Sequence, residues 1–253
     1  MIRRVLIITF VLVSINSCRP RPVNQVNARL NNEMPKKILW AWERPEDLRF
    51  LDPNEFGVAF LAQTIHIEKD SVVPDRRKQA LEVPPGTYLI AVTRIETQHD
   101  YFRRPTFDQK MGDEVARLIR GTLDLPNVKA VQVDFDATAS ERTFYRSMMS
   151  ELRKQMPEGV ALTMTSLASW CTGDAWFNDF PVDEAVPMVF QMGADSDKLK
   201  NYLRNGNDWK EPLCRGSYGI SFEEGRFEGM RDGRRTYFFK NLSWRPDDLA
   251  SVR

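Results

Sequence analysis

The feature that most constrains this chain is a series of eight short apolar runs that begins at residue 38. Each run has the length and the apolar content of one β-strand. The runs are 38–43, 57–67, 88–96, 130–136, 161–170, 184–192, 216–223 and 235–240. The sequence therefore predicts eight strands.

Helix patterns lie between several of these runs. Met111, Val115 and Ile119 recur at the spacing of a helix with one buried face. Ser140 can cap a second helix, and residues 196–204 predict a third. Strands that alternate with helices form a parallel sheet, and eight of them form a closed barrel. We therefore expect a small (β/α)8 barrel of the TIM type.

The expected barrel has about 218 residues, counted from Lys36, and its first quarter is irregular. The segment 68–87 is rich in proline and charge and shows no helical stripe. An incomplete helical ring, or an open α/β sheet, is therefore the structural alternative to a complete barrel.

The N-terminus has the three parts of an export signal. Arg3 and Arg4 precede an apolar run over 5–13, which is too short to span a bilayer. Residues 15–18, Ile-Asn-Ser-Cys, then resemble the bacterial lipobox, whose cysteine carries acyl chains such as palmitate. The resemblance implies that Cys18 anchors the chain in a membrane. An ordinary signal peptide that is cut nearby is the alternative.

This interpretation divides the chain into three parts. Residues 1–17 are the expected lipoprotein signal peptide, 18–35 a flexible tether, and 36–253 a single barrel domain. Arg19 follows the cysteine, whereas an Asp there retains many bacterial lipoproteins in the inner membrane. By that resemblance we expect the outer membrane, on its periplasmic side.

The charge balance argues against nucleic acid as a partner. Without Arg3 and Arg4, 34 of the 36 basic residues remain against 35 acidic ones, so no excess of positive charge is available for phosphates. His66 and His99 are the two histidines, and no spacing resembles a metal site. We expect no metal and no cofactor, since glycine-rich phosphate loops and nucleophilic-serine elbows are absent too.

Carboxylates stand at the end of the most apolar central strand. In Val-Gln-Val-Asp-Phe-Asp-Ala, residues 131–137, alternation puts Gln132, Asp134 and Asp136 on one face. Barrel enzymes keep their chemistry at the C-terminal ends of their strands. The residues expected at this mouth are Trp42, Glu43, Arg94, Glu96, Asp134, Asp136, Trp170, Gln191, Glu223 and Trp244.

Two facing carboxylates at a barrel mouth can hydrolyse a glycosidic bond. Asp134 or Asp136 would be the nucleophile or base, Glu96 or Glu223 the acid, and Arg94 would hold a carboxylate ionised. A gap of ~5 Å between the two groups indicates retention and ~6.5–9.5 Å inversion. Trp42, Trp170 and Trp244 could offer flat platforms to sugar rings, and Glu43 and Gln191 further polar contacts.

A purely structural interpretation competes with this one. Asp and Arg at a barrel rim often form ion pairs that only position loops, and Arg94 could simply neutralise Asp134 or Asp136. Asp183 and Glu184 precede the sixth strand, so they belong to the bottom of the barrel, where we expect a stabilising role. Function would then lie in the loops.

Five motifs resemble a bacterial envelope family that is catalogued as domain of unknown function 3142. They are Ile-Leu-Trp-Ala-Trp-Glu at 38–43, Val-Thr-Arg-Ile-Glu at 92–96, residues 131–137, Leu-Thr-Met-Thr-Ser-Leu-Ala-Ser-Trp-Cys at 162–171, and Val-Asp-Glu-Ala-Val-Pro-Met at 182–188. The match covers roughly 38–222. It implies a relation to barrel glycosidases, without an assigned reaction.

Residues 131–138 also resemble the chitinase-type motif Asp-x-x-Asp-x-Asp-x-Glu, and they depart from it at both ends. Val131 replaces the first Asp, and Thr138 replaces the Glu that donates the proton in those enzymes. We therefore expect a different acid, from Glu43, Glu96 or Glu223, or a non-catalytic barrel that holds a glycan or a protein at the membrane.

Two cysteines remain after Cys18. An oxidising envelope favours a disulfide between Cys171 and Cys214. The predicted strands oppose it, because Cys171 follows the top of one strand and Cys214 precedes the bottom of another, and a bridge needs Cα atoms within about 7 Å. Both states stay open.

Overall fold

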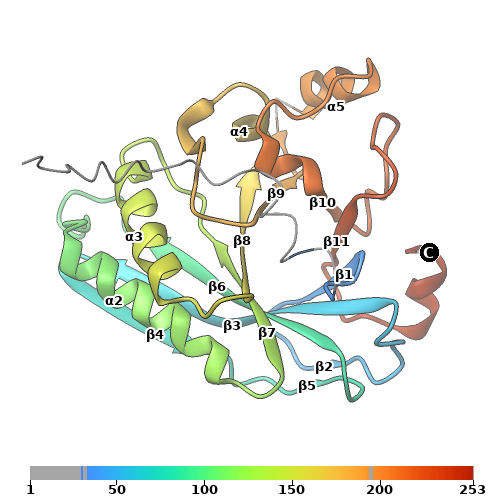
Figure 1. Ribbon diagram of the computed structural model, residues 1–253, viewed down its shortest axis with the longest axis horizontal. Helices are drawn as coiled ribbons and strands as arrows, with labels where there is room; N and C mark the ends of the chain where they lie inside the picture. Colours follow the sequence, from blue (N-terminus) through green and yellow to red (C-terminus); the bar gives the residue numbers. More distant parts are fainter. Residues whose placement is uncertain (1–29, 31–32, 194–195, 253) are drawn as a thin grey trace, which may run out of the picture.

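The computed structural model describes residues 30, 33–193 and 196–252. Within them, eight parallel strands close into a barrel (Figure 1). These strands are β1 (Lys37–Ala41), β3 (Phe56–Glu68), β6 (Tyr88–Thr97), β7 (Val128–Asp134), β8 (Ala161–Leu167), β9 (Glu184–Met188), β10 (Ser217–Ser221) and β11 (Arg235–Phe239). The ring closes because β1 pairs in parallel with both β3 and β11. The predicted barrel is confirmed, and the open-sheet alternative is wrong.

The predicted strands lie where expected, but several end early. The fifth run was expected to reach Trp170, whereas β8 ends at Leu167 and the chain turns into the short helix α4 (Ala168–Thr172). The sixth run was expected to reach residue 192, whereas β9 ends at Met188. An apolar run marks burial, and Ala168, Trp170 and Val189 stay buried beyond the ends of their strands, so composition alone does not show where a strand stops.

Alternation along the strands separates the barrel lumen from an outer layer. On β7, Val131 and Val133 pack in the cluster that lies beneath the helices, and Ala130 packs in the cluster inside the barrel. The predicted inward face is therefore confirmed for Gln132 and Asp134. Asp136, expected on the same face, lies beyond the strand, because β7 ends at Asp134. The lumen cluster takes its other members from facing strands, among them Ile38, Trp40, Ile90, Val186 and Tyr237.

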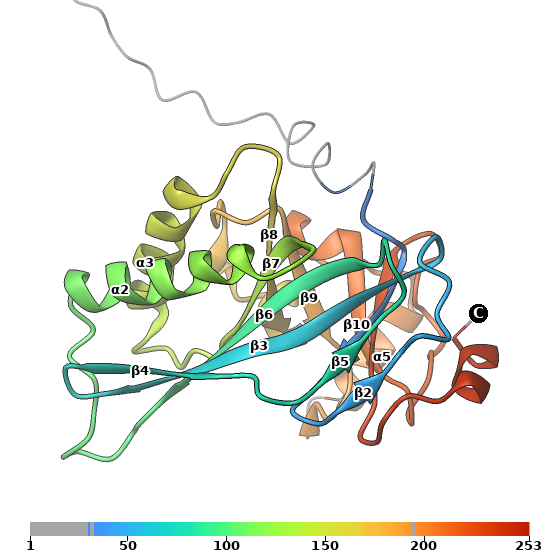
Figure 2. The same cartoon turned by 90° about the horizontal axis from the view of Figure 1, so that it is seen from below.

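Helices α2 (Gln109–Arg120) and α3 (Arg142–Gln155) lie side by side over the strands β6, β7 and β8 (Figures 1 and 2). The side chain of Asp108 caps α2, because it accepts a hydrogen bond from the amide of Met111 at 2.8 Å. The two helices approach closely at Gly112, where an added Cβ would lie 3.7 Å from the ring of Phe144. A third helix, α5 (Ser196–Arg204), coincides with its prediction.

The start of α3 differs from the prediction that Ser140 caps it. Ser140 is exposed, and the cap position is held by Glu141, which is buried. The Glu141 carboxylate accepts hydrogen bonds from the backbone amide of Thr138 at 2.7 Å and from Thr97 Oγ1 at 2.5 Å. It therefore ties the loop after β7 to the end of β6, a tertiary contact that the local spacing does not encode.

The first quarter of the barrel has no helix among its described residues. Between β1 and β6 the chain forms the two-residue strands β2 (Glu46–Asp47) and β5 (Leu81–Glu82), which pair with each other, and β4 (Ser71–Arg76), which runs antiparallel to the end of β3. The helical ring is thus incomplete, as the prolines and charges of this segment indicated. Short 3-10 turns complete the chain at Gly121–Asp124, Ala175–Phe177, Pro212–Gly216 and Pro246–Ala250.

The bottom of the barrel is closed by a buried ion pair and by the chain just before β1. Arg235 donates to Glu184 Oε1 at 2.7 Å and to the backbone oxygens of Leu30 and Pro35 at 3.1 and 2.9 Å. Tyr237 donates to the other oxygen of Glu184 at 3.0 Å. Glu184 therefore lies at the bottom, as predicted, and holds Arg235, which in turn binds the entering chain.

Asp183 also serves the bottom of the barrel. Its carboxylate accepts hydrogen bonds from Arg153 at 2.7 Å and from the amide of Leu162 at 2.8 Å. It thereby joins α3 to the start of β8, which is the structural role that its position predicted.

Cys171 and Cys214 form a disulfide, with 6.0 Å between their Cα atoms. The argument against it fails at the strand end, because Cys171 lies in α4 and not beyond the end of a longer β8. Cys214 lies in the 3-10 turn that leads into β10. The amides of Lys210 and Glu211 both donate to the Cys171 carbonyl, so the two segments already lie together.

The expected signal peptide 1–17 and Cys18 lie outside the described residues. None of the helices in the described ranges combines the length and the apolar character that crossing a bilayer requires.

Candidate functional site

The carboxylate of Asp134 lies at the top of the lumen, at the C-terminal end of β7. Its Oδ1 accepts a hydrogen bond from Thr165 Oγ1 on β8 at 2.7 Å, and its Oδ2 accepts one from Arg94 Nη1 on β6 at 3.3 Å. Only 9% of Asp134 is exposed. Neighbouring parallel strands in register thus bring three polar side chains to one point.

Arg94 joins two carboxylates at this point. Besides Asp134, its guanidinium binds Glu96, with Nε 2.9 Å from Oε1. The guanidinium also lies over the ring of Trp42, 5.5 Å from its centre. Trp42 stacks in turn on Trp40, with 5.4 Å between ring centres. A cation held between two acids and an aromatic face has few alternative positions, so the top of β6 is well fixed.

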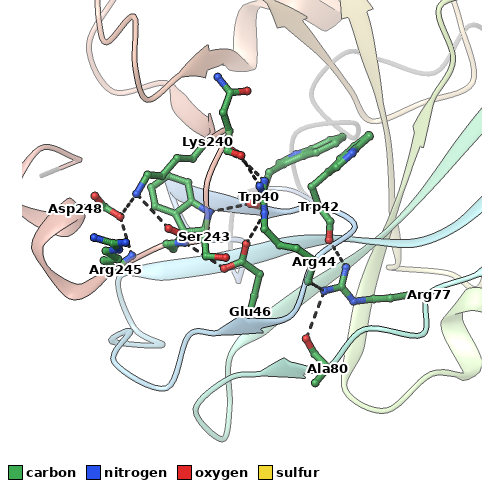
Figure 3. A network of polar contacts seen from close by, with 12 residues as sticks. Trp40, Trp42, Arg44, Glu46, Arg77, Ala80, Lys240, Ser243, Arg245 and Asp248 are labelled. Carbon is green, nitrogen blue, oxygen red and sulfur yellow. Dashed lines mark hydrogen bonds and ion pairs between the residues drawn. The ribbon is translucent and has the colours of Figure 1, made fainter.

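A network of polar contacts fixes the backbone of the loop that carries Trp42 (Figure 3). Arg77 donates to the carbonyl oxygens of Trp42 and Arg44. Glu46 is buried and accepts hydrogen bonds from Arg44 Nε at 3.0 Å and from the amide of Trp244 at 3.1 Å. Burial raises the pKa of Glu46, although the Trp244 amide and Arg44 oppose the rise. Sequence reasoning missed this network, because its members come from three separate loops.

The contacts continue from Glu96 outward to β3. Glu96 Oε2 lies 3.3 Å from His66 Nδ1, and the two residues are register partners on β3 and β6. Asp134, Arg94, Glu96 and His66 therefore form one continuous chain of polar contacts. It begins at a buried carboxylate in the lumen and ends at an exposed imidazole.

A hollow of about 250 Å³ opens beside this chain of contacts. Among its walls are Asp134, Asp136 and Glu96, three of the four residues expected to carry chemistry. Asp136 is exposed. The complete lining is Arg94, Ile95, Glu96, Thr97, Gln98, His99, Asp134, Phe135 and Asp136. Asp134 at the end of β7 and Asp136, two residues further on, thus both line an accessible space.

The two aspartates have different environments. Burial raises the pKa of Asp134, and the nearby charge of Asp136 raises it further, while the hydrogen bond from Thr165 and the charge of Arg94 lower it in part. A carboxyl group with a raised pKa retains its proton to higher pH, so Asp134 is a candidate proton donor.

The other polar residues expected at the mouth do not line this hollow. Glu223 accepts hydrogen bonds from Ser221 Oγ at 2.7 Å and from the amide of Asn241 at 2.9 Å. Burial alone would raise its pKa, but these bonds leave the pKa lowered, which disfavours it as an acid. Glu43 lines a second hollow of about 110 Å³ between β1 and the β3–β4 hairpin. Gln191 is exposed, and its backbone amide donates a hydrogen bond to the Glu224 carboxylate.

Two of the three expected aromatic platforms are wrong. Trp170 is 4% exposed and packs edge-on against Trp176 within the outer layer. Trp244 is also 4% exposed, and its Nε1 donates to the carbonyl of Trp40 at 2.8 Å. Neither ring can receive a sugar. Trp42 is partly exposed beside Arg94 and remains the platform candidate at the mouth.

Thr165 and Glu141 are two further polar residues near the site that sequence reasoning missed. Thr165 had a readable signal, because alternation along β8 puts it on the inward face next to Asp134. Glu141 had none. Its partners are Thr97 at the end of β6 and Thr138 in the loop after β7, and only the folded barrel brings them together.

Across residues 30, 33–193 and 196–252, no group of three or more His, Cys, Asp or Glu side chains is placed to hold a metal ion.

No family model matches the chain, and no curated protein sequence matches it. Among solved structures, an endo-β-N-acetylglucosaminidase from Cordyceps militaris is similar in architecture, with a TM-score of 0.46 and 8% sequence identity over 86% of this chain and 85% of that one.

Proposed function

We propose that this protein is an envelope lipoprotein whose barrel binds a glycan at its mouth and hydrolyses it. The observation that carries the proposal is the shared hollow, because Asp134, Asp136 and Glu96 all line it beside a fixed Arg94. Facing carboxyl groups at the C-terminal ends of barrel strands are the groups that cleave glycosidic bonds.

The environments suggest how the roles divide. Asp134, whose pKa burial raises, would protonate the glycosidic oxygen as the bond to it breaks. Asp136 is exposed at the hollow and would attack the sugar carbon, or would take a proton from the water that does. Arg94 would hold Glu96 and Asp134 in place and stabilise the charge that Asp134 acquires when its proton leaves.

The test is turnover of the full chain on a panel of envelope and plant polysaccharides. Asp136→Asn should abolish release of reducing ends while the far-ultraviolet spectrum stays unchanged. Asp47→Asn, at an exposed aspartate on β2, is the matched control and should keep full activity. Unchanged turnover in Asp136→Asn would remove that residue from the mechanism. Absence of turnover on every polysaccharide would remove the hydrolase proposal.

A non-catalytic glycan- or protein-binding barrel is the second candidate. The observation that favours it is Thr138, which stands where chitinase-type enzymes have their proton donor and which donates instead to Glu141 at 2.7 Å. Both oxygens of Asp134 are also engaged. In that case the wild type would show no turnover, and Asp136→Asn would weaken glycan binding. Calorimetric titration of both proteins would separate the two candidates.

The anchor and the family are proposed on sequence alone. The lipobox-like end of the signal supports acylation of Cys18 and attachment to the outer membrane, and the five motifs support membership of the envelope family of unknown function. Incorporation of labelled palmitate into the wild-type chain, but not into Cys18→Ala, would test the anchor. Leu30 packs at the bottom of the barrel, so an anchored chain would present its mouth away from the attachment side.

A further inference from the structure

Two aromatic rings are exposed on the turn that follows β6. Tyr101 is 89% exposed and Phe102 is 80% exposed, and the two rings meet edge to face with 5.5 Å between their centres. Large apolar side chains that remain in water next to each other commonly mark a binding surface. Neither ring takes part in the site described above, so their exposure needs a separate explanation.

The turn that carries the rings is held by many hydrogen bonds. The Asp100 carboxylate accepts from the amides of Phe102 and Arg103, both at 3.1 Å. Arg103 binds both oxygens of Glu68 at the end of β3, at 2.8 and 2.7 Å, and its carbonyl accepts from the amide of Lys69. A bidentate pair of this kind fixes orientation. The turn that carries the two rings is therefore preorganised, and a ligand that binds them loses little free energy to ordering the turn.

The turn begins at the wall of the hollow. Gln98 and His99 belong to the lining of the 250 Å³ hollow, and Tyr101 follows two residues later. Figure 2 shows this loop beyond the end of β6, alongside the β3–β4 hairpin. A linear ligand that leaves the hollow over His99 would meet the aromatic pair next.

The charges around the rings balance. Within the turn and the neighbouring hairpin end, Glu68, Asp70 and Asp100 stand against Lys69, Arg103 and Arg104. An anionic lipid surface or a nucleic acid is attracted by a net positive patch, which this region lacks. Flat rings in a neutral polar setting suit a ligand that offers C–H faces and hydroxyl groups, as an uncharged sugar does.

We propose that Tyr101 and Phe102 form a distal subsite for an uncharged oligosaccharide whose other end occupies the hollow. This inference rests on the proposed function and narrows it. The ligand is a glycan longer than a disaccharide, and its affinity grows when its length allows it to reach from Asp134 to the aromatic pair.

The test is calorimetric titration of the full chain with β-1,4-linked oligomers of glucose, xylose and N-acetylglucosamine, from dimers to hexamers. In Tyr101→Ala/Phe102→Ala, affinity for the best-binding hexamer should fall about tenfold, and affinity for its dimer should stay unchanged. The matched control is Leu242→Ala, since Leu242 is 69% exposed on the loop after β11, at the same end of the barrel. It should change neither affinity.

The outcomes separate this inference from the proposed function. If the wild type binds dimers and hexamers equally, or if the double variant keeps the hexamer affinity, the distal subsite is wrong and the hollow can still be a glycan site. If the wild type binds none of the oligomers, both proposals are overturned. Vesicles of phosphatidylglycerol are the second probe, with Cys18→Ala present throughout. Vesicle binding that the double variant loses would replace the glycan assignment with a bilayer contact.

Discussion

Arg94 and Asp134 are register partners on adjacent parallel strands, and their side chains meet at the barrel mouth with Nη1 and Oδ2 3.3 Å apart. The pair places a cation next to a carboxyl group that is almost wholly withdrawn from water. Burial disfavours the ionised carboxylate and the cation favours it, and burial is the larger of the two effects. The proton affinity of Asp134 is thus set by a competition that mutation can shift.

Stability should depend on the ionisation of Asp134. Its pKa is raised above the ordinary value of 3.8, so the folded state binds this proton more tightly than the unfolded chain does. The resulting stabilisation is fully present below the unfolded pKa and is lost as pH rises through the folded pKa. Asp134→Asn has no proton to lose. Its free energy of unfolding, relative to wild type, should therefore increase between about pH 4 and neutrality.

Urea unfolding at a series of pH values measures this difference. Asp113→Asn, at an exposed position on α2, is the control, and its free energy of unfolding should follow that of the wild type from about pH 4 to neutrality. A constant difference between Asp134→Asn and wild type across this range would show that the pKa of Asp134 is not raised in the folded protein.

A second prediction concerns the pair itself. Arg94→Gln leaves Asp134 buried without a cation, and we expect a loss of about 1–2 kcal/mol at pH 7, because Arg94 is half-buried and water screens part of the interaction. In the Asp134→Asn background, Arg94→Gln should lower the free energy of unfolding by less, because no buried carboxylate is left without its cation. A double-mutant cycle on the urea midpoints measures the coupling, and strictly additive effects would show that the pair stabilises nothing.

The barrel could be predicted from the sequence because its signals are local and repeated. Runs such as 130–136 combine apolar content with alternation, and the stripe from Met111 to Ile119 marks a helix between two of them. The inward face of β7 follows from alternation alone, so the sequence is enough to place Asp134 at the mouth.

The rest of the site depends on contacts between distant segments. Nothing near Trp170 shows that the chain leaves the sheet at Leu167, and that one error led to the wrong platform and to the argument against the disulfide. Trp244 looked available because it follows the last strand, yet its ring is buried against Trp40. Apolar composition reports burial, and it does not report what covers a side chain.

The network behind Trp42 yields a third prediction. Glu46 is 2% exposed and holds both Arg44 and the amide of Trp244. In Glu46→Ala these donors lose their buried acceptor, so we expect a loss of about 2–4 kcal/mol in the free energy of unfolding. Glu82→Ala, at an exposed position on β5, should change it by less than about 0.5 kcal/mol. Equal urea midpoints for the two variants would contradict the role given to Glu46.

The disulfide yields the fourth prediction, because Cys171 and Cys214 are 43 residues apart in sequence. A cross-link over a loop of this length lowers the entropy of the unfolded chain and stabilises the fold by about 2–4 kcal/mol. Cys171→Ala/Cys214→Ala should lose that amount in urea unfolding under oxidising conditions. With a reductant present, wild type should move to the lower midpoint, and the variant should stay where it is.

Two measurements test whether the disulfide is present in the isolated protein. Thiol titration of the denatured wild type without reductant should find neither cysteine of the pair reactive, whereas titration after reduction should find both. The mass of the reduced protein should exceed that of the oxidised protein by two hydrogen atoms. If both thiols react without reduction, the bridge is absent in the isolated protein. If the bridge is present but the variant unfolds at the wild-type midpoint, contacts such as those from Lys210 and Glu211 to the Cys171 carbonyl already hold the two segments together without it.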